Sequence, residues 1–151
     1  MDTSSDYREI FSILNTYKVK YMLVGAYAVA YYSEPRFTKD LDIYIKPDLK
    51  NANRVYKALK EFGAPLKGVC PKDFTDENMV FQIGVAPIRV DIMMGLAGVK
   101  FDSAWKKRIR AKYADVPINI LGIRELIKSK KKTKRLQDRL DLERLIEKVR
   151  R

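Results

Sequence analysis

The stretch VGAYAVAYYSEPRFTKDLDIYI, residues 24–45, places two aspartates one residue apart in a chain of 151 residues with a formal net charge of +12. Its DLDIYI segment (40–45) is predicted to be a strand, because β-branched and aromatic residues dominate it. Side chains alternate between the faces of a strand, so Asp40 and Asp42 share one face, with Cα atoms about 6.6 Å apart. Two carboxylates at that separation repel each other unless a cation such as Mg²⁺ binds between them. The alternative is a solvent-facing edge strand with protective charges.

Residues before the acidic pair are suited to binding phosphate. Gly25 lies between the apolar run YMLV and the alanine-rich run AYAVAYY, a predicted strand and helix. At such a junction the free N–H groups of the first helical turn can bind a phosphate, although a simple tight turn would also explain the glycine. Arg36, Thr38 and Lys39 precede Asp40 and supply donors and positive charge for phosphate oxygens.

A third aspartate lies in the predicted strand IRVDIM, residues 88–93. Asp91 lies on the face opposite Ile88, Val90 and Ile92. A charged side chain in an apolar strand is costly without a partner. We therefore expect Asp91 to meet the first two carboxylates and to complete a site for one or two divalent cations.

The pattern of the whole chain predicts an α/β (α+β) fold, a mixed sheet flanked by helices with a C-terminal helical segment. We expect one domain over residues 1–151, with a core at about 21–121 and a basic helical tail at about 122–151. The predicted helices are 6–15, 26–32, 49–62, 123–129 and 136–148; the predicted strands are 21–24, 40–45, 79–83, 88–93 and 116–121, with a loop at 64–78. The strands at 79–83 and 88–93 form a predicted hairpin.

The amino-acid composition limits the catalytic mechanisms that the protein can use. Histidine is absent, which excludes Ser-His-Asp and Cys-His catalysis and zinc sites that need imidazole. A single cysteine and the absence of a long apolar run predict a cytoplasmic protein without a membrane span. Residues 122–151 carry twelve Lys or Arg against five Asp or Glu, and such a surface attracts polyanions unless it is simply solvated.

The order VGAYAVAYY, RFTKDLDI, RVDIM resembles the minimal nucleotidyltransferases of the DNA polymerase beta superfamily. The resemblance implies that Asp40, Asp42 and Asp91 are catalytic ligands of Mg²⁺ or Mn²⁺ in a two-metal mechanism. It also implies that Gly25 and Ala26 bind the nucleoside triphosphate, with Arg36, Thr38 and Lys39. Family members usually have Gly or Ser at the second position of this glycine motif, so Ala26 departs from the pattern.

The tail LIKSKKKTKRLQDRLDLERL is similar to the C-terminal signature of a bacterial branch related to abortive-infection and toxin–antitoxin nucleotidyltransferases. The match selects Lys130 and Arg135 as contacts to the nucleotide or acceptor, and Asp138 and Asp141 as the tail motif. Lys128, Lys131 and Lys132 compete for the place of Lys130. In the alternative interpretation, the tail acids pair with Arg135, Arg139 and Arg144 at helical spacing.

The function implied is transfer of a nucleoside monophosphate to a hydroxyl of an RNA, such as a tRNA end, or of a protein. Phe101, Trp105 and Tyr113 would stack on RNA bases or, alternatively, pack in the core. A small-molecule acceptor is a weaker hypothesis, because the chain has little room for a separate substrate domain. The rival class is a catalytically lapsed module that binds nucleotide, RNA or a toxin partner, which Ala26 favours.

Overall fold

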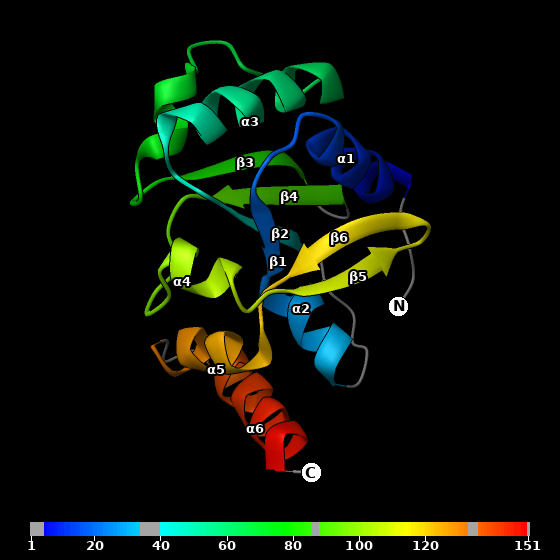
Figure 1. Ribbon diagram of the computed structural model, residues 1–151, viewed down its shortest axis with the longest axis vertical. Helices are drawn as coiled ribbons and strands as arrows, with labels where there is room; N and C mark the ends of the chain where they lie inside the picture. Colours follow the sequence, from blue (N-terminus) through cyan, green and yellow to red (C-terminus); the bar gives the residue numbers. More distant parts are fainter. Residues whose placement is uncertain (1–4, 34–39, 86–87, 133–135, 151) are drawn as a thin grey trace.

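A six-stranded mixed sheet forms the centre of the computed structural model, which describes residues 5–33, 40–85, 88–132 and 136–150. Its strand order is β3-β4-β2-β1-β6-β5 (Figure 1). The strands are β1 (Tyr21–Val24), β2 (Asp40–Ile45), β3 (Val80–Val85), β4 (Ile88–Met93), β5 (Ile109–Tyr113) and β6 (Val116–Ile120). The helices are α1 (Ser5–Thr16), α2 (Gly25–Tyr32), α3 (Leu49–Phe62), η1 (Pro71–Thr75, a 3₁₀ helix), α4 (Phe101–Trp105), α5 (Ile123–Lys131) and α6 (Leu136–Arg150). The predicted mixed sheet flanked by helices is confirmed.

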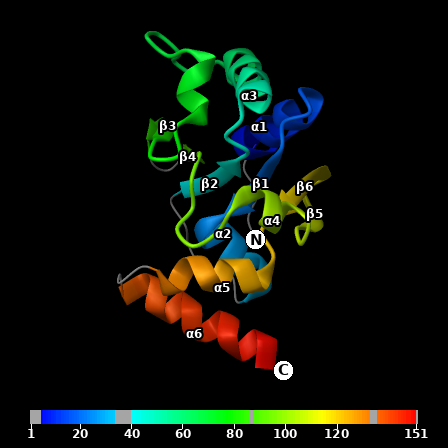
Figure 2. The same cartoon turned by 60° about the vertical axis from the view of Figure 1, so that its left-hand side comes forward.

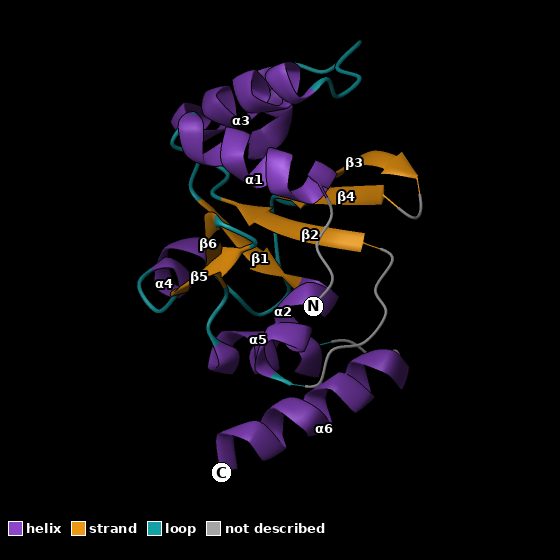
Figure 3. Ribbon diagram, turned by 90° about the vertical axis from the view of Figure 1, so that its right-hand side faces the viewer, coloured by secondary structure: helices purple, strands orange, loops and turns teal. Residues whose placement is uncertain are grey.

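Helices cover both faces of the sheet. Helices α1 and α3 lie on one side, whereas α2, α5 and α6 lie on the other (Figures 1 and 3). Helix α5 packs along α6 (Figure 2). The face toward α1 is apolar: Phe11 stacks on Tyr21, and Leu41 and Ile43 of β2 are fully buried. The same alternation directs Asp40 and Asp42 to the opposite face, toward α2.

Most predicted elements agree with the structure, and four of them, β1, β2, β4 and α3, have the predicted bounds. Three elements were missed: α4, β5 and the short η1. The β5 sequence IRAKY alternates apolar and basic residues, so that Tyr113 is buried while Arg110 and Lys112 are exposed. Because of these basic residues, the sequence pattern did not predict a strand at β5. The loop predicted at 64–78 contains η1, whose first residue is Pro71, a residue favoured there because its φ is already helical.

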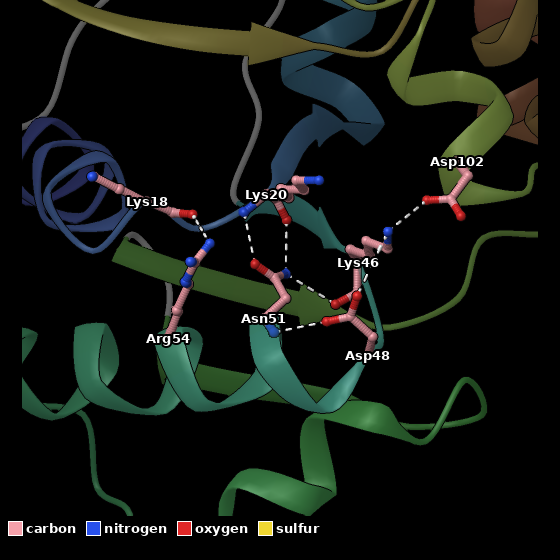
Figure 4. A network of polar contacts seen from close by, with 7 residues as sticks. All are labelled: Lys18, Lys20, Lys46, Asp48, Asn51, Arg54 and Asp102. Carbon is pink, nitrogen blue, oxygen red and sulfur yellow. Dashed lines mark hydrogen bonds and ion pairs between the residues drawn. The ribbon is translucent and has the colours of Figure 1, made fainter.

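A buried amide joins the two central strands to α3. Asn51 accepts a hydrogen bond from the backbone N–H of Lys20 (2.8 Å) and donates to the carbonyl groups of Lys20 (3.0 Å) and Lys46 (2.9 Å), as Figure 4 shows. Asp48 caps α3 by accepting from the N–H of Asn51 (2.7 Å). Since Lys20 precedes β1 and Lys46 follows β2, these bonds hold the ends of both strands in place.

Peripheral contacts extend this network. The Nζ of Lys46 lies 3.1 Å from Asp102 in α4, and Arg54 donates to the carbonyl of Lys18 (3.2 Å) (Figure 4). Within the described residues, no helix combines the length and apolar character that a membrane span requires.

Candidate active site

The register of two parallel strands brings the three predicted carboxylates together. Strands β2 and β4 are neighbours, with Asp42 directly opposite Asp91 and Asp40 opposite Arg89. Direct partners in adjacent strands present their side chains on the same face. The three acids, which lie 49 residues apart along the chain from Asp42 to Asp91, therefore share one face of the sheet.

Gly25 lies directly against this cluster. Strand β1 runs antiparallel to β2 with Val24 opposite Asp42, and the chain turns into α2 at the next residue. Gly25 has a φ of +70°, and a Cβ added there would overlap the Asp42 carboxylate, 2.9 Å from its Cγ. Both features require glycine. The Val24 side chain does not cap α2. The backbone N–H groups of the first turn of α2, that of Ala26 among them, are therefore available to donate to a ligand.

The pKa of Asp42 is strongly raised in this cluster. Burial, followed by the negative charges of Asp91 and Asp40, raises the pKa of Asp42 from 3.8 to about 7. The charges of Lys130 and Arg89 offset this increase in part. Because the neighbouring carboxylates disfavour the ionised form of Asp42, a cation bound among them would be stabilised.

Arg89 is a site residue that the sequence interpretation missed. Its Nε and Nη2 donate to the two oxygens of Asp91, at 3.2 and 3.1 Å, and Nε lies 3.7 Å from Oδ2 of Asp40. The Tyr7 hydroxyl donates to the Arg89 carbonyl (3.1 Å). The signal was available, because the alternation that pairs Asp40 with Asp42 also places Arg89 beside Asp91.

The donor chemistry fits a hard divalent cation. Carboxylate oxygens are the ligands that Mg²⁺ prefers. The charges of Asp91 and Asp40 contribute, after burial, to the raised pKa of Asp42. Among the residues that the structure describes, no three Asp, Glu, Cys or His side chains are gathered closely enough to hold a metal ion as they stand. In this arrangement the Arg89 guanidinium engages both oxygens of Asp91.

The tail contributes a lysine whose side chain is 11% exposed. The Nζ of Lys130 in α5 lies 2.7 Å from Asp138 and 3.4 Å from Asp141, both in α6 and both buried. Its charge also lowers the pKa of Asp42, which ties the tail electrostatically to the carboxylate cluster. The N-terminal end of α6 lies on the same side of the molecule as the start of β2 (Figure 3).

The alternative interpretation paired the tail acids with Arg135, Arg139 and Arg144, and of these Arg135 lies outside the described residues. The tail acids contact Lys130, whereas Arg139 and Arg144 are exposed. All three competing lysines, Lys128, Lys131 and Lys132, are also exposed. Four predicted nucleotide-binding residues lie outside the described residues: Arg36, Thr38, Lys39 and Arg135.

No family model matches the sequence, and no curated protein matches it. Solved structures do match. The lincosamide antibiotic adenylyltransferase LnuA, bound to lincomycin, has a TM-score of 0.58 at 16% identity, covering 97% of this chain and 98% of that one. The antibiotic-resistance factor ANT(2'')-Ia has a TM-score of 0.63 at 10% identity, over 97% and 86% of the two chains. A Thermotoga maritima protein assigned as a nucleotidyltransferase has a TM-score of 0.56 at 18% identity, over 95% and 86%.

The chain has the nucleotidyltransferase fold. In this nucleotidyltransferase fold the aromatic residues near the basic segment serve packing. Phe101 and Tyr113 are buried, and Trp105 stacks on Phe101 (5.5 Å) with the Arg108 guanidinium 3.7 Å from its ring centre. Core packing, rather than stacking on RNA bases, is therefore the role that Phe101 and Tyr113 have.

A groove of about 940 Å³ lies at the opposite end of β2. Its wall includes Tyr44, Lys46 and Phe101, and none of the three clustered aspartates lines it. Tyr44 follows Asp42 on the same strand face, but its hydroxyl donates to the Val99 carbonyl (3.0 Å) and it is buried. The groove is thus separate from the carboxylate cluster.

Proposed function

We propose that the protein is a divalent-cation-dependent nucleotidyltransferase that moves a nucleoside monophosphate from a triphosphate to an acceptor hydroxyl. The observation that carries this proposal is the register pair Asp42–Asp91 beside the Gly25 turn. The fold supports it, since similar structures include two antibiotic-modifying proteins, one named an adenylyltransferase and one solved with adenylyl-2''-tobramycin.

Each residue has a part in this reaction. Asp40 and Asp42 would hold the Mg²⁺ that binds the triphosphate, and Asp91 would join them in holding a second. Bound divalent cations neutralise phosphate charge and lower the pKa of the attacking hydroxyl. The N–H groups that follow Gly25 would donate to phosphate oxygens.

The transfer itself forms one bond and breaks another. The acceptor oxygen bonds to the α-phosphorus and releases its proton to solvent. The bond from the α-phosphorus to the bridging oxygen breaks, and pyrophosphate leaves with the electron pair. Positioning and charge stabilisation drive such a reaction, so the absence of histidine is no obstacle.

We propose RNA as the acceptor, since the surface of the chain is strongly basic. Lys106, Arg110 and Lys112 are exposed along α4 and β5, and α5 and α6 add further basic residues. Such surfaces bind the phosphate backbone of nucleic acids. The sequence interpretation gives a small acceptor less weight, because the chain has little room for a separate substrate domain. The antibiotic adenylyltransferase LnuA is matched over 98% of its own chain, so a chain of similar extent can be an antibiotic adenylyltransferase. A small-molecule acceptor is therefore one arm of the test.

The tail favours a place in the abortive-infection and toxin–antitoxin branch, with a protein hydroxyl on a toxin partner as the second acceptor. The ion pairs of Lys130 with Asp138 and Asp141 support the proposal that these three tail residues act together as one motif. The second candidate function, a lapsed nucleotide- or RNA-binding module, rests on Ala26, which keeps the backbone donor but lacks a hydroxyl.

Labelling separates these functions. The protein would be incubated with each α-labelled triphosphate and Mg²⁺, together with bulk RNA, cell lysate, lincomycin or tobramycin. Label on one acceptor, lost in Asp42→Asn and retained in the surface control Asp115→Asn, supports the enzyme and identifies the acceptor. Nucleotide binding without transfer to any acceptor supports the lapsed module.

A further inference from the structure

Arg89 holds the carboxylates that the proposed function assigns to the cation. Both oxygens of Asp91 accept hydrogen bonds from its guanidinium, and Asp40 lies within ion-pair distance. A fork of two N–H groups on one carboxylate is a strong, directional contact. Any cation that binds an oxygen of Asp91 on this side must therefore displace at least one of these hydrogen bonds.

The backbone of Arg89 is held firmly while its side chain has room to move. Strand β4 lies inside the sheet between β3 and β2, and the Tyr7 hydroxyl binds the Arg89 carbonyl. The side chain keeps 35% of its surface exposed. A displacement of Arg89 would therefore involve its side chain and leave the register of Asp91 unchanged.

A second partner for the guanidinium lies on the neighbouring strand. Gln82 of β3 is the register partner of Asp91. When its amide oxygen faces Arg89, that oxygen accepts from Nε at 2.8 Å. The guanidinium thus has an acceptor at the rim of the cluster that does not depend on the aspartates.

We propose that Arg89 is an internal counter-cation, which holds Asp91 and Asp40 in the cation-free protein, gives way when the divalent cation binds, and then contacts the triphosphate. This inference rests on the proposed function and adds a positioning and substrate-binding residue to it. In the absence of a cation, Arg89 offsets part of the negative charge of Asp40 and Asp91. Once freed, its planar fork matches phosphate oxygens.

Mn²⁺ titration of the full chain tests the competition. Calorimetry without nucleotide would compare the wild type with Arg89→Gln, and Arg8→Gln serves as the control because Arg8 pairs with Asp115 on the surface. We expect Arg89→Gln to bind Mn²⁺ about 10-fold more tightly, equivalent to about 1.4 kcal/mol and typical of one charge-assisted hydrogen bond. Arg8→Gln should match the wild type.

Titration with α,β-methylene-ATP at saturating Mn²⁺ tests the second half of the inference. Here Arg89→Gln should bind the nucleotide about 10-fold more weakly, because a charge-assisted contact to phosphate is lost. A purely structural role for Arg89 would not move the two affinities in opposite directions. Arg89→Lys keeps the positive charge but loses the forked pair of N–H donors. It should strengthen Mn²⁺ binding and weaken nucleotide binding as Arg89→Gln does, but by smaller factors. Arg89→Lys replaces Arg89→Gln in both titrations if the latter variant does not fold.

Unchanged or weaker Mn²⁺ binding in folded Arg89→Gln would overturn the inference, because the arginine would then support the cation site rather than compete for it. With label transfer intact, the proposed function would stand alone. If Asp91→Asn bound Mn²⁺ as the wild type does, the carboxylate cluster would not be the cation site, and both proposals would fall.

Discussion

Gly25 approaches Asp42 so closely that a methyl group at residue 25 would overlap the carboxylate. The two residues belong to different elements, the first turn of α2 and the middle of β2, and antiparallel pairing of β1 with β2 brings them together. The absence of a side chain at this turn therefore sets where the Asp42 carboxylate can lie.

Gly25→Ala should abolish label transfer while the protein still folds. The positive φ costs about 1–2 kcal/mol for a residue with a Cβ, and the methyl group must also push Asp42 aside. Gly63→Ala is the matched control, because Gly63 also has a positive φ, of +93°, but no atom lies within 4 Å of the added Cβ. Urea unfolding and the labelling assay check both variants. Equal transfer by the two alanine variants would show that the Asp42 contact does not matter.

Asp42→Asn should make the cation-free protein more stable at high pH. The folded-state pKa of about 7 lies above the ordinary 3.8, so the native state holds its proton more tightly than the unfolded state does. As the pH rises from about 4 to 7, the wild type loses stability that the variant keeps. The difference should reach the order of 2–4 kcal/mol above pH 7, since one pKa unit corresponds to about 1.4 kcal/mol.

Urea unfolding in EDTA between pH 4 and 8 measures this difference. Asp115→Asn should behave in the opposite sense, because the hydrogen bond from Arg8 lowers the pKa of Asp115 to about 2. Asp115→Asn should be slightly less stable than the wild type from neutral pH down to about pH 4. A pH-independent difference between Asp42→Asn and the wild type would contradict the raised pKa of Asp42.

Asn51→Ala should lower the free energy of unfolding by about 2–4 kcal/mol. Three side-chain hydrogen bonds are lost, and the part-buried backbone groups of Lys20 and Lys46 are left without this partner. Asn53→Ala provides the control, because Asn53 lies on the same helix and is exposed. If both variants unfold at the same urea concentration, the amide does not hold the strand ends.

Lys130→Met should destabilise the protein by about 3–5 kcal/mol, the usual cost of removing one partner from a buried ion pair. Asp138 and Asp141 would lose a cation that lies 2.7 and 3.4 Å away. Lys131→Met is the control, since Lys131 is the exposed neighbour. Thermal unfolding of both variants measures the effect. A similar small loss in both would mean that Lys130 does not join α5 to α6.

Local pattern was enough to predict the elements that carry the candidate site. The period of two in DLDIYI places Asp40 and Asp42 on one face of β2, and the same alternation in IRVDIM separates Asp91 from the apolar residues of β4. Glycine at residue 25 marked the start of α2. Such features depend on neighbours within one turn or strand, and these are readable from the chain. The basic residues of β5 obscured the same pattern there.

Relations between distant segments depended on tertiary structure. Alternation states which face Asp91 uses, but the register with β2 could slip by two residues without changing that face. The packing of both strands in the sheet sets Asp42 opposite Asp91 and Asp40 opposite Arg89. The fork of Arg89 on Asp91, the contact of Gly25 with Asp42 and the ion pairs of Lys130 with two tail acids all follow from such packing. Buried groups must fill space and find partners throughout the fold, and this condition is not written in any single segment.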